Sequence, residues 1–144
     1  MVVVAPTAAW SAQVTHGRVH EFAAGVTQAL DIDGHAVMIR ASGRTYVFVH
    51  VTGLTPNTAY GAHVHKAACG ATDAAGSPIF ADGHYRFDPL GPADALNEIW
   101  PEFTTNAAGV GNGFARNDGI AGPTAVAVVI HAPGGAKIAC ADLD

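Results

Sequence analysis

The chain alternates hydrophobic and polar residues in short runs. Within Thr45–Thr52, valine occupies every second position from 47 to 51. An alternation with a period of two is typical of a β-strand that buries one face. Similar runs recur between turns rich in glycine, proline and asparagine. The predicted strands are Ala36–Ser42, Thr45–Thr52, Ala59–His65, Glu102–Thr105, Val110–Arg116, Thr124–His131 and Ala136–Ala141.

These short strands, together with the lack of a helical period, predict an all-β protein. An antiparallel sandwich or flattened barrel is the expected architecture. Residues 1–14 show no clear period and are interpreted as an N-terminal arm, so a single β-barrel domain is expected over residues 15–144. From Lys66 to about Pro101 neither a strand nor a helix pattern appears. A loop of about 35 residues in a compact domain is usually functional.

Composition agrees with a compact globular domain and excludes several functions. Hydrophobic residues make up 49% of the 144 residues and charged residues 13%, which argues against disorder. The net charge of −5 provides no basic field of the kind that nucleic-acid binding needs. No hydrophobic run reaches the roughly 18–20 residues of a membrane-spanning helix. Met1–Val4 is too short for a signal peptide, so we expect any export signal to have been removed or never present.

Histidines give the strongest indication of chemistry. His63 and His65 end a predicted strand, and the period of two places both imidazoles on one face. His84 lies in the long loop and His131 ends another predicted strand, so each can add a ligand from a separate segment. Imidazole suits copper and zinc, and a tetragonal nitrogen set favours Cu(II). The pattern therefore predicts an all-histidine site for a redox metal.

Four sequence blocks occur in order along the chain. They are Gly61-Ala62-His63-Val64-His65, Gly83-His84, Val129-Ile130-His131 and Gly135-Ala136-Lys137-Ile138-Ala139-Cys140. Together they resemble the copper/zinc superoxide dismutase family over roughly residues 36–143. The resemblance implies a Greek-key β-barrel with a long ligand-bearing loop. Residue by residue, it implies copper ligands at His63, His65, His84 and His131, with His84 matching the histidine that bridges copper to zinc.

Two cysteines also match the family. The resemblance implies an intramolecular disulfide between Cys69 and Cys140, whereas counting alone leaves open two unrelated buried thiols. The disulfide would tie the ligand-bearing loop to the barrel wall. It implies an oxidising compartment, so we expect an extracytoplasmic protein that is secreted, periplasmic or on the cell surface.

The chain departs from the family where zinc should bind. The family's zinc site needs two more histidines and an aspartate, but no histidine lies between His84 and Phe103, and Asp88 and Asp94 alone cannot hold zinc. Only Ala132–Gly135 separate the last two predicted strands, so the family's electrostatic loop is expected to be missing. The chain thus resembles the copper-only branch, known among secreted proteins of bacteria and fungi. We expect one copper ion and no zinc.

Without zinc, another group must orient the ring of His84, a role that a carboxylate usually takes. Glu98 is the first candidate and Asp88 the second, unless Glu98 is an ordinary solvated carboxylate. Lys137 stands where the family has its active-site arginine and lacks arginine's planar fork. Lys137 is expected to attract superoxide as a cation, with Arg86 as the alternative unless it is a plain surface residue.

The resemblance implies a secreted, copper-only superoxide dismutase with an antioxidant role. It would convert superoxide to O2 and H2O2, with His84, Glu98 and Lys137 in catalysis. The alternative is a copper storage or delivery protein of the same fold with little dismutase activity. A hydrolytic or structural zinc site is less favoured, because four histidines lack a nearby general base. Superoxide is the expected partner, without nucleic acid or a membrane span, and the sequence indicates no oligomeric state.

Overall fold

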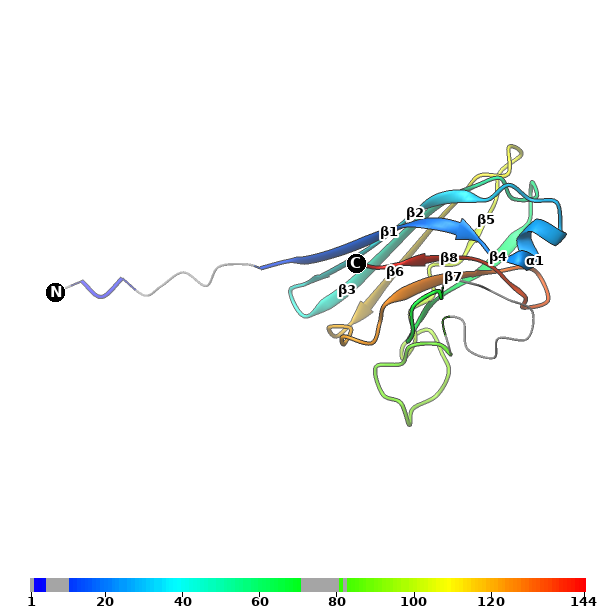
Figure 1. Ribbon diagram of the computed structural model, residues 1–144. Helices are drawn as coiled ribbons and strands as arrows, with labels where there is room; N and C mark the ends of the chain where they lie inside the picture. The colour runs from blue at the N-terminus through cyan, green and yellow to red at the C-terminus, as the bar shows by residue number, and fades with distance from the viewer. Residues whose placement is uncertain (1, 5–10, 71–80, 82) are drawn as a thin grey trace.

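A computed structural model describes residues 2–4, 11–70, 81 and 83–144 of the chain. Within these residues, eight antiparallel strands form one sheet that curls into a nearly closed barrel (Figure 1). The strand order is β5-β4-β7-β8-β1-β2-β3-β6. This confirms the predicted all-β barrel. The elements are β1 Gln13–Glu21, α1 Ala23–Thr27, β2 Asp33–Ala41, β3 Arg44–Thr52, β4 Ala59–His65, β5 Phe103–Thr104, β6 Gly111–Asp118, β7 Ala127–His131 and β8 Lys137–Asp142.

The two ends of the strand order, β5 and β6, pack against each other at the seam of the nearly closed barrel. A tight turn joins the two strands, and in it the Gly109 amide donates to the carbonyl of Asn106. The backbone of Gly113 packs against the carbonyl of Pro101 so closely that a Cβ atom at this position would lie 2.0 Å from the carbonyl oxygen. Because β4, β5 and β6 follow one another and β7 returns beside β4, the connectivity is a Greek key.

The hydrophobic alternation of the sequence defines the barrel interior. The valines at positions 47, 49 and 51 of β3 are buried, and the residues between them face outward. On that outer face, the rings of Phe48 and Phe114 pack with centroids 5.0 Å apart. All seven predicted strands are present, with ends shifted by no more than three residues.

One strand and one helix lie in a region for which the hydrophobic pattern predicts neither. In β1 only Val19 is buried, so no alternation marks the strand in the sequence. The strand forms because its backbone pairs with β2 on one side and with β8 on the other. The short helix α1 follows, and its buried Gly25 packs against the backbone of Ile138.

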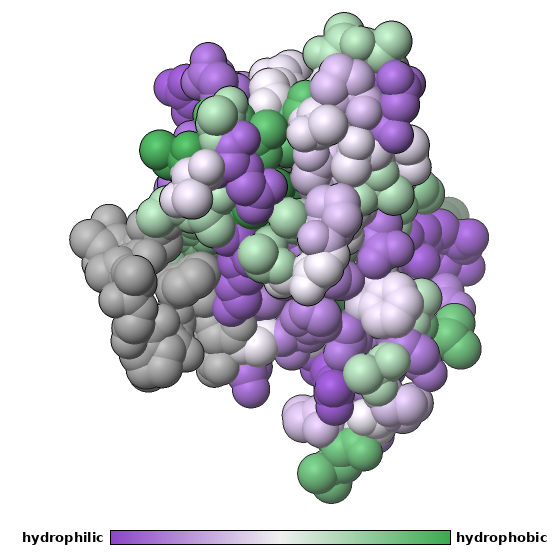
Figure 2. Space-filling view, turned by 90° about the vertical axis from the view of Figure 1, so that its right-hand side faces the viewer, coloured by the Kyte–Doolittle hydropathy of each residue, from purple (hydrophilic) through white to green (hydrophobic). Residues whose placement is uncertain are grey.

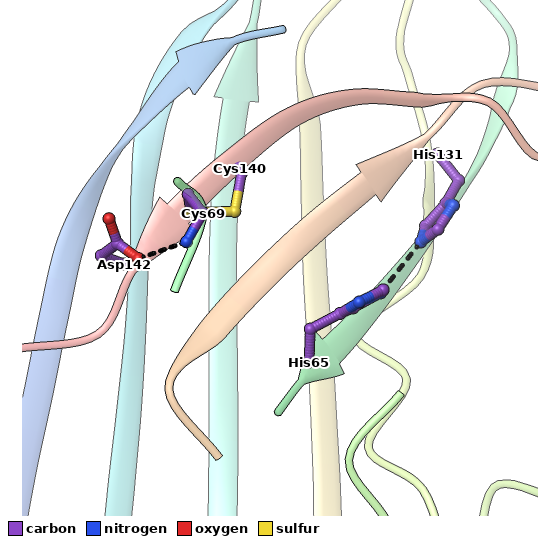
Figure 3. Close-up of a disulfide and its surroundings, with 5 residues drawn as sticks. All are labelled: His65, Cys69, His131, Cys140 and Asp142. Atoms are coloured by element: carbon purple, nitrogen blue, oxygen red, sulfur yellow. Dashed lines mark hydrogen bonds between the residues drawn. A yellow bond between two sulfur atoms is a disulfide. The ribbon is translucent and has the colours of Figure 1, made fainter. Parts of the chain in front are cut away.

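The outer faces of β7 and β8, with residues from neighbouring loops, carry a second, smaller hydrophobic cluster. Its members are Phe22, Cys69, Ala81, Ala127, Val129 and Cys140. The predicted disulfide between Cys69 and Cys140 is confirmed, with Cα atoms 5.8 Å apart, and the Cys69 amide also donates to Asp142 Oδ1 at 2.7 Å (Figure 3). The start of the long loop is therefore fixed against the barrel wall by a covalent bond and a hydrogen bond.

The connection between β7 and β8 is short, covering residues 132–136. The Gly135 amide donates to the carbonyl of Ala132, and the Ala132 amide donates to the carbonyl of Ala136. Gly135 has a positive φ of 99°, a conformation that glycine adopts without strain. No long loop intervenes between these two strands, as the sequence predicts.

The surface seen in Figure 2 is largely hydrophilic, with hydrophobic residues in small separate groups. Exposed large hydrophobic residues come from different parts of the chain, among them Val26 of α1 and Leu90 of the long loop. Scattered residues of this kind are normal on a protein surface. Within the described residues, no helix is long and apolar enough to cross a membrane.

Candidate metal centre

Strands β4 and β7 bring three histidines to the outside of the barrel. In β4, Tyr60 and the alternate residues after it face the core, so His63 and His65 face outward. His131 ends β7 directly opposite Gly61 in the strand register. A Cβ atom at Gly61 would lie 3.4 Å from His63 Cε1 and 3.5 Å from His131 Cβ. Position 61 therefore lies in the same outer surface as both rings, and a Cβ atom there would make ordinary contacts with them.

The long loop contributes the fourth histidine. Its segment around His84 pairs with the end of β4 as an isolated antiparallel bridge to His65. The Tyr85 amide donates to the carbonyl of Val64 at 2.8 Å, and the Lys66 amide donates to the carbonyl of Gly83 at 3.1 Å. The loop thus behaves locally like a short added strand and holds His84 over the other rings.

The four histidines form a compact cluster of nitrogen donors. Each offers one ring nitrogen, and these atoms lie within 4.8 Å of one another. Among the described residues, this is the one group of three or more such side chains that could hold a metal ion. His65 and His131 are buried, whereas the side chain of His84 is 32% exposed. The cluster is closed on the barrel side and open to solvent beside His84.

Hydrogen bonds to the other ring nitrogens determine which nitrogen faces the cluster. His84 Nδ1 lies 2.7 Å from Glu98 Oε2, His63 Nε2 lies 3.2 Å from Glu102 Oε1, and His131 Nδ1 lies 3.1 Å from the carbonyl of Gly135. Because carboxylate and carbonyl oxygens only accept, each of these nitrogens carries the hydrogen. The lone pairs of His84 Nε2, His63 Nδ1 and His131 Nε2 are left facing inward. Outer partners of this kind are usual for metal-binding histidines.

The cluster fits a metal ion that prefers imidazole. His63 Nδ1 is buried and has no hydrogen-bond partner. A buried polar atom without a partner is rare and needs an explanation, which a metal ion supplies. His65 Nε2 and His131 Nε2 are 3.3 Å apart (Figure 3). Because His131 carries its hydrogen on Nδ1, His65 Nε2 is the donor of this bond, and its hydrogen would shift to Nδ1 when a metal binds. Four imidazoles suit copper or zinc better than magnesium or calcium.

Burial keeps the histidines in the form that binds metals. Burial and the neighbouring His84 and His131 lower the pKa of His63 to about 3. Burial also lowers the pKa of His131, although its hydrogen bond to Gly135 opposes the change. Both rings are therefore neutral near pH 7, as metal coordination requires.

Glu98 is a buried carboxylate with three donors around it. Its side chain is 1% exposed. Oε2 accepts hydrogen bonds from His84 Nδ1 and from Trp100 Nε1, each at 2.7 Å, and Oε1 accepts one from Arg86 Nε at 3.0 Å. Burial alone would raise the pKa of Glu98, but the hydrogen bonds from Trp100, His84 and Arg86 outweigh it and hold the pKa below its usual value. Glu98 is therefore ionised beside His84.

Two asparagines fix the part of the loop that carries Glu98. The Asn97 side chain donates to the carbonyls of Asp88 and Pro92 at 2.9 Å and accepts from the Asp88 amide at 2.8 Å. The buried Asn117 of β6 donates to the carbonyls of Ala95 and Glu98 at 2.9 and 2.8 Å. This part of the loop, described from residue 83 onward, is thus cross-linked to itself and to the barrel by side-chain hydrogen bonds.

Comparisons with known proteins agree with this architecture. No protein-family model matches the chain, and no curated protein matches it either. Among solved structures, a Cu/Zn superoxide dismutase from Brucella abortus is similar, with a TM-score of 0.57 and 20% sequence identity over 92% of this chain and 100% of that chain. The chain has the superoxide dismutase fold. At this identity the likeness concerns the fold, so activity must be argued from the site.

Within this superoxide dismutase fold, the residues singled out in the sequence occupy different places. Glu98 contacts His84, whereas Asp88 Oδ1 accepts from the Leu90 amide and takes part in a loop turn. Arg86 is bonded to Glu98 and, through Nη1, to the carbonyl of Gly91. Lys137 begins β8, opposite His131 in the strand register, and is partly buried. The other loop aspartate, Asp94, accepts from the amides of Leu96 and Asn97.

Sequence reasoning did not identify Glu102 or the role of Trp100. Glu102 contacts His63, and Trp100 contacts both Glu98 and, edge-on at 5.8 Å between ring centroids, His63. The signal available in the sequence is the spacing of Glu98, Trp100 and Glu102 at alternate positions, the last of which begins the predicted strand Glu102–Thr105. An extended segment places such residues on one face.

Proposed function

We propose that this protein is a copper-dependent superoxide dismutase that uses one copper ion and no zinc and works outside the cytoplasm. The observation that carries the proposal is the contact between His84 Nδ1 and the buried, ionised Glu98. A second metal on this nitrogen would have to displace the carboxylate and leave Arg86 and Trp100 without their acceptor. Glu98 thus takes the place that a second metal would need.

Dismutation consumes two superoxide ions and two protons and yields one O2 and one H2O2. Copper held by His63, His65, His84 and His131 would supply the electron exchange, because it cycles between two oxidation states. The chain itself must hold the metal, attract the anion and move protons.

His84 is the residue best placed to handle a proton. Its Nδ1–H is held by Glu98, so Nε2 is the nitrogen that could accept a proton from solvent whenever it is not bound to copper, and could then pass that proton to a leaving peroxide. The ring is also 32% exposed, which gives solvent protons access. When Nε2 is protonated, the negative charge of Glu98 stabilises the imidazolium. Glu98 therefore orients the ring in one state and balances its charge in the other.

Cations beside the cluster support the approach of an anion. A cavity of about 320 Å³ adjoins His84, and its lining includes Lys66 and Arg86. Lys137 pairs with His131 in the strand register. Three of the chain's seven lysines and arginines thus lie around this site, and one of them, Arg86, is paired with Glu98. Cationic side chains beside a site raise the rate at which an anionic substrate associates.

The disulfide supports the proposed location. Disulfides persist in oxidising compartments and are rare in the cytosol. The Cys69–Cys140 bond anchors the loop that carries His84, so the site depends on conditions that keep this bond oxidised.

The test compares copper-loaded protein with three variants. His131→Ala should lose copper and dismutation together, whereas His20→Ala, an exposed histidine on β1, should change neither. Glu98→Gln keeps the size of the side chain but removes its charge. It should keep most of the bound copper and slow dismutation by roughly 10²-fold, as expected when a proton-handling group loses its partner.

Two outcomes would contradict the proposal. Tight copper binding with a dismutation rate no higher than that of His131→Ala would indicate the storage or delivery alternative. Stoichiometric zinc in the isolated protein that copper does not displace would overturn the metal assignment.

A further inference from the structure

The segment from Glu98 to Glu102 forms an outer wall of the metal centre. Ile99 is fully buried in the barrel core, and Pro101 is buried as well. The side chains of the alternate residues, Glu98, Trp100 and Glu102, contact the histidines or one another. One five-residue stretch therefore seals the barrel with one face and borders the cluster with the other.

Pairing with β4 fixes the position of this wall. Tyr60 pairs with Phe103, and farther along the same two segments the Val64 amide donates to the carbonyl of Ile99 at 3.0 Å. Both contacts follow one antiparallel register, because four residues forward along β4 correspond to four residues back along the other segment. Extending the register places Glu102 beside Gly61, the position with no side chain next to His63. Glu102 thus reaches the His63 ring from the backbone of a paired segment rather than from a free loop.

We propose that Glu102 is a positioning residue that holds His63 with Nδ1 toward the metal. Its carboxylate lies 3.2 Å from His63 Nε2, on the side of the ring opposite the partnerless Nδ1. Without this acceptor, the hydrogen of the neutral ring is no longer held on Nε2, so Nδ1 is no longer kept free for a metal. The metal role rests on the proposed function, but the ring orientation is a property of the metal-free protein.

The wall acts on two rings at once. His63 and His84 stack with centroids 4.1 Å apart, and each has a carboxylate on its outer nitrogen. Trp100 lies between these carboxylates, donating to Glu98 and touching the His63 ring with its edge. Because Glu98 is buried and the side chain of Glu102 is 51% exposed, the two carboxylates differ in their access to solvent. Glu102 can therefore be changed with little effect on the loop.

The experiment measures the Cu(II) dissociation constant by chelator competition at fixed pH. Three variants are compared: Glu102→Ala, Glu102→Gln and the charge control Asp118→Asn. Asp118 is an exposed carboxylate on β6 that pairs with Arg44. Losing an outer partner of a metal ligand weakens metal binding by about 10–100-fold. We expect a loss of that size for Glu102→Ala, a smaller loss for Glu102→Gln, whose amide oxygen still accepts the hydrogen bond, and none for Asp118→Asn.

A second readout needs neither copper nor catalysis. In the ¹⁵N spectrum of the metal-free protein, His63 should carry its hydrogen on Nε2 alone in the wild type and in Glu102→Gln. Glu102→Ala should show a mixture of the two tautomers. Copper affinity of Glu102→Ala within twofold of the wild type, or an unchanged His63 spectrum, would overturn the inference. If the protein binds copper but lacks dismutase activity, the proposed function fails while both of these readouts still apply.

Discussion

Each histidine of the cluster has two ring nitrogens, and its neighbours decide which one faces inward. His84 and His63 are oriented by carboxylates, and His131 by the carbonyl of Gly135 in the short turn after its own strand. For His63 the inward nitrogen is Nδ1, whereas for His84 and His131 it is Nε2. The four residues are thus chemically alike in sequence but different in the folded site.

The neutral state of the buried rings has a consequence for the metal-free protein. The pKa of His63 is about 3 in the folded chain, against 6.5 for an unperturbed histidine. Between these values the unfolded chain binds a proton that the folded chain does not, so stability falls as the pH decreases. The Tm of metal-free protein should therefore decrease from pH 7 to about pH 5, above the range in which carboxylates titrate.

Two variants check the origin of this pH dependence. His63→Gln cannot bind the proton in the unfolded state, so its Tm should depend less on pH than that of the wild type. His16→Gln, an exposed residue of β1, should keep the wild-type slope. Equal slopes for His63→Gln and the wild type would show that other groups cause the effect.

At the level of single residues, the sequence shows which side chains can bind a metal but not how they are supported. The four histidines stand in recognisable blocks, so they can be predicted as a set. Glu98 could be proposed because some carboxylate had to support His84. Glu102 could not, because its contact with His63 depends on the pairing of the 98–102 segment with β4. That pairing joins segments about 40 residues apart and leaves no local pattern in the sequence.

At the level of elements, a strand can be recognised in the sequence when it buries every second side chain. β3 buries every second residue and is obvious in the pattern, whereas β1 buries only Val19 and is not. β1 depends on backbone pairing with β2 and β8, which a hydrophobic pattern does not report. The same limit applies to the long loop, where Asn97 and Asn117 create order through side-chain hydrogen bonds.

The close packing of Gly113 against Pro101 can be tested by adding one methyl group at position 113. A Cβ atom at Gly113 would lie 2.0 Å from the carbonyl oxygen of Pro101 and 2.7 Å from the side chain of Val49. Gly113→Ala must therefore push β5 and β6 apart, and overpacking of this kind costs about 1–3 kcal/mol. The free energy of unfolding is the quantity to measure, by denaturant titration.

A matched glycine provides the control for this substitution. At Gly122 the nearest atom to a new Cβ is the Tyr85 hydroxyl oxygen, 3.6 Å away, which is an ordinary contact. Gly122→Ala should be nearly neutral. Similar stabilities for the two alanine variants would contradict the close packing of the two barrel edges.

At the scale of the whole molecule, the metal centre joins two parts with different sources of stability. The barrel supplies His63, His65 and His131, and hydrophobic burial maintains it. The loop supplies His84 and is held by the disulfide, the hydrogen bond to Asp142 and the asparagine contacts. Loss of the loop contacts should therefore affect metal binding without unfolding the barrel.

Removal of the disulfide tests this division. The double variant Cys69→Ser/Cys140→Ser opens a link between residues 71 apart, worth about 4 kcal/mol in the chain-entropy model. We expect a lower Tm and, because His84 is then less firmly placed, a faster release of copper to a chelator. Asp142→Asn weakens only the adjacent hydrogen bond and should cause a smaller change in both. Copper release as slow as in the wild type would show that the disulfide does not position His84.

The candidate site lies on the outside of β4, and this placement affects which residues of the strand can be substituted without disturbing the core. Tyr60, Ala62 and Val64 build the barrel core, while Gly61, His63 and His65 contribute only to the outer site. Substitutions at the odd-numbered positions should therefore alter the candidate metal site and leave the packing of the interior intact. The requirements of the core and those of the candidate site thus fall on alternate residues of one strand. Each set of residues can change with little effect on the other.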